Sequence, residues 1–299
     1  LTPIHPKVAA VLVRSRPQGR VPRALPSLSV FDHAMVWLPS WNRFVDTTQR
    51  HIGLWELPEE DIGAQVLILK DDADAKLRAT PIPGAKQSGI EGRYEVILTV
   101  KGRARISGKM RFRGMRAPLY RKRFHDKDTQ RNRLGSLLAA RYPGVSLERF
   151  TVSSTTNLER PLDIRFNAIA PSLLTRHGAE LHLTRPAGGD GLARVYARAS
   201  ARRYPLVIGP PSAHVFSFRY LIPSGWRIKS LPAPKQEKAF FGRYAVTWSA
   251  EKGGATVETR FRLDRDQIAT QDYPAFKAYM KRFDDAVQVP LVLVRTSAP

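Results

Sequence analysis

Apolar and polar positions alternate along much of this chain, which is the pattern of strands that bury one face. The run KVAAVLVRS at 7–15 is more continuously apolar and predicts a buried strand, while residues 16–30 are rich in Pro and Arg and predict a loop. FDHAMVWLPSWNRFVDTT at 31–48 follows, with the turn-forming letters PSWN at 39–42 between two apolar arms. We expect a β-hairpin there, in which the numbers of paired residues sum to 81. GAQVLILKD at 63–71 predicts another strand.

The pattern beyond residue 78 divides into a linker and a long region of mostly short strands. Residues 78–89 contain two prolines and two glycines and predict the linker. Residues 117–141 predict a helix that ends before Pro143-Gly144. The expected strands are a pair within 90–113, followed by 147–156, 161–169, 193–200, 213–222, 226–231, 243–249, 255–264 and 289–295. Many short strands separated by turn signals favour a β-sandwich.

A closing helix is expected from Asp272, a residue type that caps helix N-termini, with Pro274 in the first turn. Apolar side chains then recur every three or four residues and define one buried face. They are Tyr273, Phe276, Met280, Phe283 and Val287.

The hairpin brings together two residues that can carry chemistry. In the expected pairing Met35 faces Asp46, and His33 lies two residues along on the same face of the sheet. Such diagonal neighbours lie about 7–8 Å apart at the backbone, within reach of an imidazole and a carboxylate. A turn longer by one residue would place them on opposite faces. From these residues alone, His33 is explained equally well as a buried core histidine and Asp46 as an aspartate that caps a turn.

The composition removes several classes of site. The chain has no cysteine, which excludes disulfides, thiolate metal sites and a cysteine nucleophile within these residues. No G-x-S-x-G motif occurs, and PAGGDG at 186–191 lacks the Lys-Ser/Thr that a phosphate-binding loop requires. His177 and His182 are five residues apart, the wrong spacing for one face of a strand, and no carboxylate cluster completes a metal site. We expect no cofactor and no metal.

Net charge is the most unusual property of the composition. The chain carries 49 Lys and Arg against 26 Asp and Glu, a formal charge of +23, and residues 101–150 hold fifteen of the cations and three of the anions. In the second strand of the 90–113 pair, the cations fall on odd positions and predict a basic outer face. They are Arg103, Arg105, Lys109, Arg111 and Arg113. A solvated sheet face explains this run most simply, an anionic membrane or envelope surface comes next, and nucleic acid ranks last because few aromatics interleave.

Two long stretches resemble a known family. VAAVLVRSR…LPSLSVFDHAMVWLP…RFVDTTQRHIGLWELPEEDIGAQVLIL resembles the C-terminal half of the bacterial transglutaminase-like core, with its FNH and DxT motifs. RRYPLVIGPPSAHVFSFRYLIPSGW and QDYPAFKAYMKRFDDAVQVPLVLV are similar to the β-sandwich that follows this core in one branch of the family. The resemblance assigns the catalytic histidine to His33 and the catalytic aspartate to Asp46. Asp32 replaces the family's Asn, and Phe44-Val45 precedes Asp46.

The resemblance implies an α+β fold: a partial papain-like, transglutaminase-like antiparallel sheet, followed by a β-sandwich domain with two helices. The implied domains are residues 1–78 for the C-terminal part of the core, 79–89 for the linker and 90–299 for the sandwich. The family's cysteine lies on a helix before the first strand, and we expect that this chain begins inside the domain. The family also implies a periplasmic or extracellular location. No apolar run is long enough for a transmembrane segment.

Two functional hypotheses follow. In the first, the chain is a fragment of a cysteine acyltransferase, amide hydrolase or peptidase that acts on a peptide or protein substrate, and the fragment alone is inactive because loss of a triad nucleophile costs on the order of 10⁶ in turnover. In the second, the chain is a non-catalytic basic β-sandwich module that binds an anionic polymer or membrane surface.

Overall fold

The N-terminal part of the chain forms a five-stranded antiparallel sheet in the order β3-β2-β1-β4-β5. The computed structural model describes residues 8–22, 24, 27–69, 77–184, 186–189 and 191–296. The five strands are β1 (Ala9–Arg14), β2 (His33–Leu38), β3 (Arg43–Val45), β4 (Gln65–Ile68) and β5 (Leu77–Ala79). Part of the strand expected at 63–71 and the first residue of that at 7–15 lie outside the described residues.

The hairpin register agrees with the prediction from the sequence. Val36 pairs with Val45 and Trp37 with Phe44, so the partner numbers sum to 81. A 3₁₀ turn at Pro39–Trp41 reverses the chain, and Asn42 follows it in the left-handed conformation at φ 49°. Asn tolerates that conformation better than most residues, which explains how a turn of this length closes.

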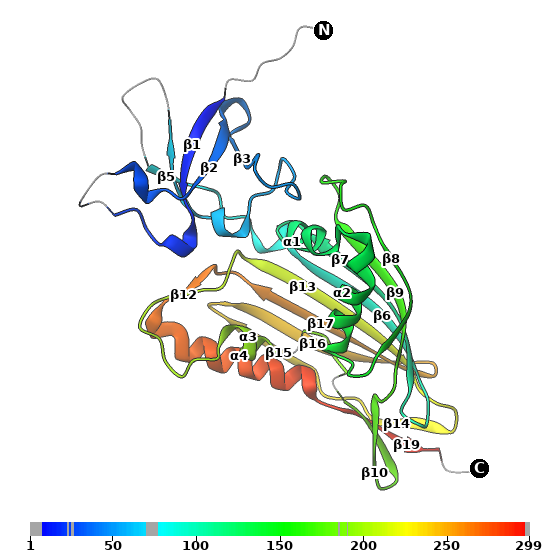
Figure 1. The fold of residues 1–299 in the computed structure, drawn as a ribbon. Coiled ribbons are helices and arrows are strands. Elements are labelled where there is room, and N and C mark those ends of the chain that lie inside the picture. Colours follow the sequence, from blue (N-terminus) through cyan, green and yellow to red (C-terminus); the bar gives the residue numbers. More distant parts are fainter. Residues whose placement is uncertain are drawn as a thin grey trace.

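The rest of the chain is built around an eight-stranded sheet, in the order β15-β16-β17-β13-β6-β7-β9-β8 (Figure 1). Neighbouring strands are antiparallel except β13 and β6, which are parallel. Its strands are β6 (Gly89–Leu98), β7 (Ala104–Arg113), β8 (Ser146–Val152), β9 (Leu162–Ala170), β13 (Ser212–Leu221), β15 (Lys235–Ala239), β16 (Gly242–Glu251) and β17 (Gly254–Leu263).

Two small antiparallel sheets complete the strands. One has the order β10-β11-β19-β14, and the other pairs β12 with β18. Their bounds are β10 (Leu174–His177), β11 (Glu180–Leu183), β12 (Leu206–Val207), β14 (Trp226–Ser230), β18 (Gln267–Ile268) and β19 (Leu291–Arg295). The chain is therefore mostly β with few helices, as expected for an α+β or mainly β protein.

Helices cover one face of the large sheet. They are α1 (Arg116–Phe124), α2 (Lys127–Ala139), α3 (Leu192–Tyr196) and α4 (Tyr273–Gln288). Phe124 and Leu138 from the first two helices, the apolar face of α4 and the four-stranded sheet share one buried core with the large sheet. The layer opposite the large sheet is therefore mixed helix and strand, whereas the sequence suggested a sandwich with two helices.

The single helix expected at 117–141 is wrong, because the structure breaks it into α1 and α2 at His125 and Asp126. Asp126 has an extended backbone, at φ −83° and ψ 112°, and its side chain accepts a hydrogen bond from the backbone N–H of Asp128. An aspartate in this role starts a new helix.

The apolar face predicted for α4 is confirmed, since its five members are all buried.

The strand expected at 193–200 is also wrong. Residues 192–196 form α3, whose first backbone N–H groups, on Leu192 and Ala193, both donate to the carboxylate of Asp284 on α4 at 2.9 Å. This tertiary contact satisfies donors that a short helix leaves unpaired. It lies about ninety residues away in sequence, so the local pattern does not reveal it.

Arg121 on α1 joins the two parts of the chain. Its side chain is 1% exposed and forms an ion pair with Glu56 at 2.6 Å. The same guanidinium donates to the backbone carbonyls of His51, Leu158 and Arg160. Figure 1 shows α1 between the N-terminal sheet and the large sheet. The N-terminal part has a separate hydrophobic cluster, and β5 extends its sheet to residue 79. The division of the chain into domains at 1–78 and 90–299, with a linker at 79–89, stays a prediction.

Candidate functional site

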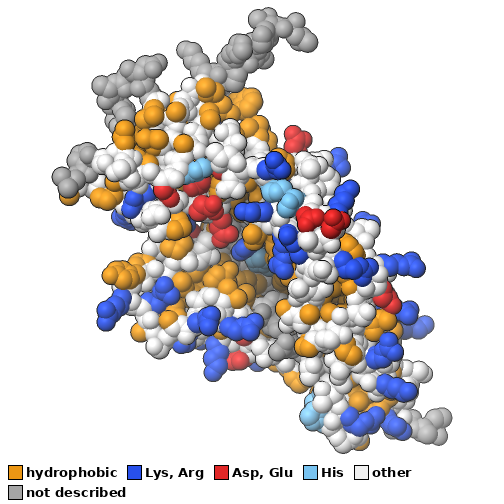
Figure 2. All heavy atoms as spheres, in the orientation of Figure 1, with side chains coloured by type: hydrophobic (Ala, Val, Ile, Leu, Met, Phe, Trp, Pro, Cys, Tyr) orange, Lys and Arg blue, Asp and Glu red, His pale blue; other side chains and the backbone are white. Residues whose placement is uncertain are grey.

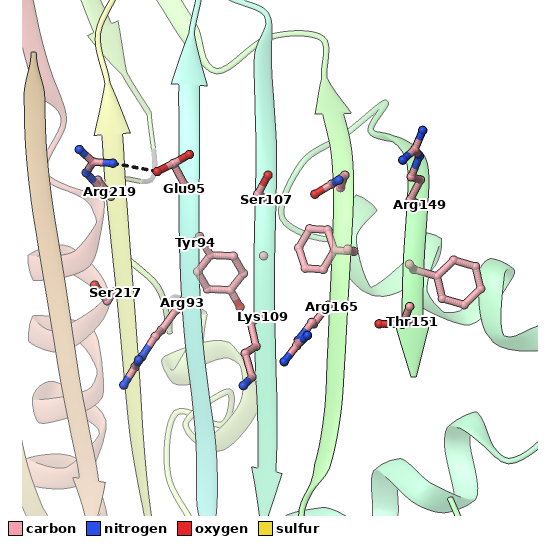
Figure 3. Close-up of a pocket in the computed structure, with 14 residues that line it drawn as sticks. Arg93, Tyr94, Glu95, Ser107, Lys109, Arg149, Thr151, Arg165, Ser217 and Arg219 are labelled. Atoms are coloured by element: carbon pink, nitrogen blue, oxygen red, sulfur yellow. Dashed lines mark hydrogen bonds and ion pairs between the residues drawn. The ribbon is translucent and has the colours of Figure 1, made fainter. Parts of the chain in front are cut away.

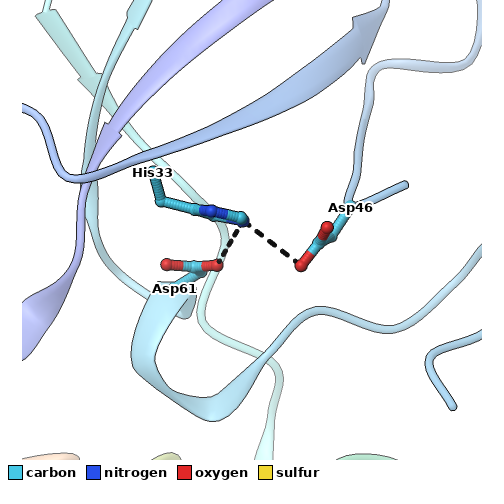
Figure 4. A group of neighbouring side chains, drawn as sticks. All are labelled: His33, Asp46 and Asp61. Atoms are coloured by element: carbon cyan, nitrogen blue, oxygen red, sulfur yellow. Dashed lines mark hydrogen bonds and ion pairs between the residues drawn. The ribbon is translucent and has the colours of Figure 1, made fainter. Parts of the chain in front are cut away.

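His33 and Asp46 meet at the open end of the hairpin. His33 begins β2, Asp46 follows β3 directly, and the Nε2 atom of His33 lies 3.3 Å from the Oδ2 atom of Asp46. The side chain of Asp46 is fully buried and that of His33 is 24% exposed. The predicted convergence on one face of the sheet is therefore present in the structure (Figure 4).

Thr48 fixes the orientation of the Asp46 carboxylate. Both the backbone N–H and the hydroxyl of Thr48 donate to Oδ1 of Asp46 at 2.7 Å. This local turn is one that Asp side chains commonly make with the residue two positions on. Because Oδ1 is occupied, Oδ2 is the oxygen left to face His33. The DTT letters at 46–48 thus provide both the carboxylate and its support.

Asp32 has no part in this contact. Its carboxylate accepts hydrogen bonds from the backbone N–H of Ser15, at 2.8 Å, and from the Ser15 hydroxyl, at 2.5 Å. Burial raises the pKa of Asp32, but the Ser15 hydrogen bonds outweigh it and hold the pKa below its usual value. The opposite-face position expected from strand alternation agrees with this partner.

Asp61 is a third member of the site that the sequence analysis missed. It ends the 3₁₀ turn Glu59–Asp61, is 1% exposed, and places Oδ2 3.6 Å from Nε2 of His33. Its backbone carbonyl accepts a hydrogen bond from the hydroxyl of Thr80, which ties the turn to the end of β5. In the sequence, nothing distinguishes Asp61 from the acidic residues Glu59 and Glu60 beside it.

The second carboxylate changes the electrostatics of the site. Burial is the largest cause that raises the pKa of Asp61, to about 6, and the charge of His33 opposes it. The nearby carboxylates of Glu60, Asp46 and Asp32 raise this pKa further. The buried carboxyl group of Asp61 therefore holds its negative charge less readily than an exposed one, unless a cation lies beside it.

The basic strand predicted at 103–113 has the expected alternation. Even positions of β7 are buried and its cationic odd positions are not. Several of these cations are neutralised, because Lys109 and Arg111 both approach Asp163, at 3.7 and 2.7 Å, and Arg113 pairs with Glu91 at 2.9 Å. On the face shown in Figure 2, Lys and Arg side chains are spread over many elements and do not form one patch.

A row of like charges crosses the open face of the large sheet. Lys109 lies directly opposite Arg93 of β6 on one side and Arg165 of β9 on the other. These three line a shallow hollow of about 680 Å³ (Figure 3). Within the described part of the chain, Arg93 and Arg165 form no ion pair with a carboxylate, whereas the neighbouring Arg219 binds Glu95 at 2.8 Å. Like charges directly opposite each other destabilise a sheet, so this row favours the binding of an anion that would offset the repulsion.

His177 and His182 lie closer than their spacing suggested. They come from the two strands of the β10–β11 hairpin, and their ring centroids are 4.5 Å apart. The two histidines therefore meet across the hairpin, although the five-residue spacing predicted no shared face along one strand. Nε2 of His182 contacts Glu180 at 2.9 Å, and that carboxylate also binds Lys229. The pair sits in a local surface network of charges.

Comparisons with known proteins found a family model and a solved structure that are similar to this chain. A family model described as "Domain of Unknown Function with solved-structure structure (DUF3858)" matches residues 183–293, which lie outside the His33 region. A crystal structure described as that of a "putative protease" from Parabacteroides distasonis is similar over 96% of this chain, with 9% identity and a TM-score of 0.49. The chain spans 40% of the length of that protein. The search of curated proteins gave no significant match.

The helices of the described residues include none with the length and apolar character needed to cross a membrane.

Proposed function

We propose that this chain carries the His–Asp pair of a transglutaminase-like cysteine acyltransferase or amide hydrolase. The observation that carries the proposal is the 3.3 Å contact between Nε2 of His33 and a buried, Thr48-fixed Asp46. A carboxylate at this distance favours the tautomer with the proton on Nε2, which leaves the lone pair on Nδ1. Nδ1 makes no hydrogen bond within the described residues, and the ring is partly exposed. The general base is therefore Nδ1.

The reaction needs a thiol, and this chain contains no cysteine. In the proposed enzyme a thiol from outside these 299 residues transfers its proton to Nδ1 of His33, and the thiolate attacks an amide carbonyl. The imidazolium then protonates the departing amine as the carbon–nitrogen bond breaks, which leaves a thioester. Water or a second amine releases the acyl group. His33 and Asp46 alone lack the nucleophile and are expected to show no measurable turnover.

The tautomer of His33 tests the proposal on the chain itself. Nitrogen NMR of chelator-treated protein at a pH where His33 is neutral should show the proton on Nε2. Asp46→Asn should weaken this preference, and Asp32→Asn, a matched change on the opposite face, should leave it intact. A proton found on Nδ1 in the unmodified chain contradicts the proposal, because Nδ1 then has no lone pair to accept the thiol proton.

Activity provides a second test in any longer form of the protein that includes a cysteine. Release of ammonia or amine from glutamine peptides should fall on the order of 10⁴-fold in Asp46→Asn, the size of effect seen when a triad carboxylate is lost. Asp32→Asn should retain activity. An enzyme with full activity after Asp46→Asn would rule out the assigned role of that residue.

The open sheet face supports a second candidate function, binding of an anionic polymer or membrane surface. The supporting observation is the in-register row of Arg93, Lys109 and Arg165. Binding to vesicles that contain phosphatidylglycerol should be strongest at about 50 mM salt and fall steeply at higher salt. The Arg93→Gln, Arg165→Gln double variant should lose most of it, whereas Arg103→Gln, Arg105→Gln should not. No binding at the lowest salt would remove this candidate.

A further inference from the structure

Three ligand-type atoms surround one point at the open end of the hairpin. Nε2 of His33 lies 3.3 Å from an oxygen of Asp46 and 3.6 Å from an oxygen of Asp61. One ligand atom from each of the three residues lies within 4.8 Å of the other two. Figure 4 shows both carboxylates turned toward the same side of the imidazole.

These distances suit a tetrahedral cation. A zinc ion binds imidazole nitrogen and carboxylate oxygen at about 2.0–2.2 Å, which places two of its ligands roughly 3.3–3.6 Å apart. The two measured separations from Nε2 fall in this range. The two carboxylate oxygens lie within 4.8 Å of each other, so a tetrahedral site requires them to close by at most about 1.5 Å.

A second observation concerns Asp61. Neither of its carboxylate oxygens accepts a hydrogen bond from any of the described residues, although its side chain is only 1% exposed. Buried polar atoms are nearly always satisfied, and an exception calls for an explanation such as a bound ion. The Oδ2 atom of Asp61 faces His33, so a cation between the three residues would satisfy that oxygen.

We propose that His33, Asp46 and Asp61 bind one divalent transition-metal cation of the zinc class. The ligands are Nε2 of His33 and one oxygen from each carboxylate, which leaves the fourth position of a tetrahedral cation for another ligand. A nitrogen and oxygen donor set without sulfur suits Zn²⁺, Co²⁺ or Mn²⁺. Thr48 supports the site from behind, because its two hydrogen bonds hold Oδ1 of Asp46 and leave Oδ2 for the cation.

This inference does not depend on the proposed function, and the two use the same nitrogen in opposite ways. A metal requires the lone pair of Nε2, whereas the triad requires a proton on it. Cation binding and acyl transfer therefore exclude each other. In an enzyme of the proposed type, the cation would hold the His–Asp pair in an inactive state.

Calorimetric titration of the chelator-treated chain with ZnCl₂ tests the site. We expect one zinc per chain with micromolar or tighter affinity, and at least about tenfold weaker binding in Asp61→Asn. Glu60→Gln removes a charge from the same turn without removing a ligand and should bind as the unmodified chain does. His182→Gln controls for the surface histidine pair. Titration with Co²⁺ should give the intense visible absorption of a tetrahedral site, and Asp61→Asn should lose it.

Three results would overturn the site. They are unchanged zinc affinity in Asp61→Asn, loss of zinc binding in His182→Gln, and no binding by the unmodified chain. If Asp61→Asn does not fold, as judged by circular dichroism, His33→Gln replaces it and should abolish binding. The tautomer experiment needs no metal and the zinc titration needs no thiol, so failure of one proposal is distinguishable from failure of the other.

Discussion

At the scale of single residues, the site depends on how each carboxylate is held. Asp46 is fixed by a residue two positions away, so its orientation is encoded locally. Among the described residues, the hydrogen bonds of Asp61 come from its backbone, within its turn and from Thr80, while its carboxylate contacts His33. The first arrangement gives a preorganised partner for His33, and the second leaves the Asp61 carboxylate free to respond to the charge beside it.

The Thr48 hydroxyl provides a prediction at this scale. Thr48→Val keeps the shape of the side chain and the backbone N–H bond but removes one donor from the buried Asp46 carboxylate. A hydrogen bond to a charged group contributes about 1.5–3 kcal/mol. Because Thr48 is exposed, we expect a smaller loss, of about 1–2 kcal/mol in the free energy of unfolding. Urea unfolding measures it. Thr47→Val, next to it and exposed, should change stability by less than about 0.5 kcal/mol. Equal losses in both variants would contradict the role of Thr48.

At the scale of elements, cross-strand charge pairs neutralise part of the positive charge of strand β7 in the large sheet. Asp163 of β9 lies directly opposite Arg111, and the two carboxylate oxygens accept two hydrogen bonds from the guanidinium at 2.7 and 2.8 Å. This bidentate pair offsets part of the repulsion that a strand rich in cations imposes on its neighbours. Sequence alternation predicted the cationic face of β7 but gave no sign of which cations are paired.

The same pair predicts how stability depends on pH. The hydrogen bond from Arg111 is the largest cause that lowers the pKa of Asp163 in the folded state. A carboxyl group with a lowered folded pKa binds more protons when unfolded, so its contribution is complete above about pH 4 and is lost as pH falls further. We expect the unmodified chain to lose stability more steeply than Asp163→Asn between about pH 4 and pH 2. The free energy of unfolding of both proteins is measured by urea denaturation at each pH. If it falls equally with pH in both, the pair contributes nothing to stability.

At the scale of the whole molecule, Arg121 connects two separately packed regions. The N-terminal sheet and the large sheet have distinct hydrophobic clusters, and among the described residues beyond position 89 only Met115, just before α1, belongs to the N-terminal cluster. The buried guanidinium of Arg121 spans the junction, since it binds Glu56 and a carbonyl on one side and two carbonyls on the other. This placement holds the segment that follows Asp46 against α1.

Removal of this cation should therefore loosen the junction. Arg121→Met leaves the Glu56 carboxylate without its ion-pair partner, although the Gly53 N–H still donates to it. Breaking a buried pair from one side costs about 3–5 kcal/mol. We expect the free energy of unfolding to fall by that amount and amide hydrogen exchange to become faster at residues 49–57. Lys122→Met, an exposed neighbour on the same helix, should have little effect on either measurement. Unchanged exchange at 49–57 would show that the junction does not depend on Arg121.

The sequence by itself determined those features that follow from a local period. The two-residue repeat of a strand and the length of one turn were enough to place His33 and Asp46 on the same face, and the helical repeat gave the buried face of α4. Tertiary structure decided the rest. Asp61 reaches His33 only because a loop folds back over the sheet, α3 forms on a carboxylate from α4, and His177 meets His182 across a hairpin. Such contacts depend on how the elements pack in space, and no repeat along the chain records that packing.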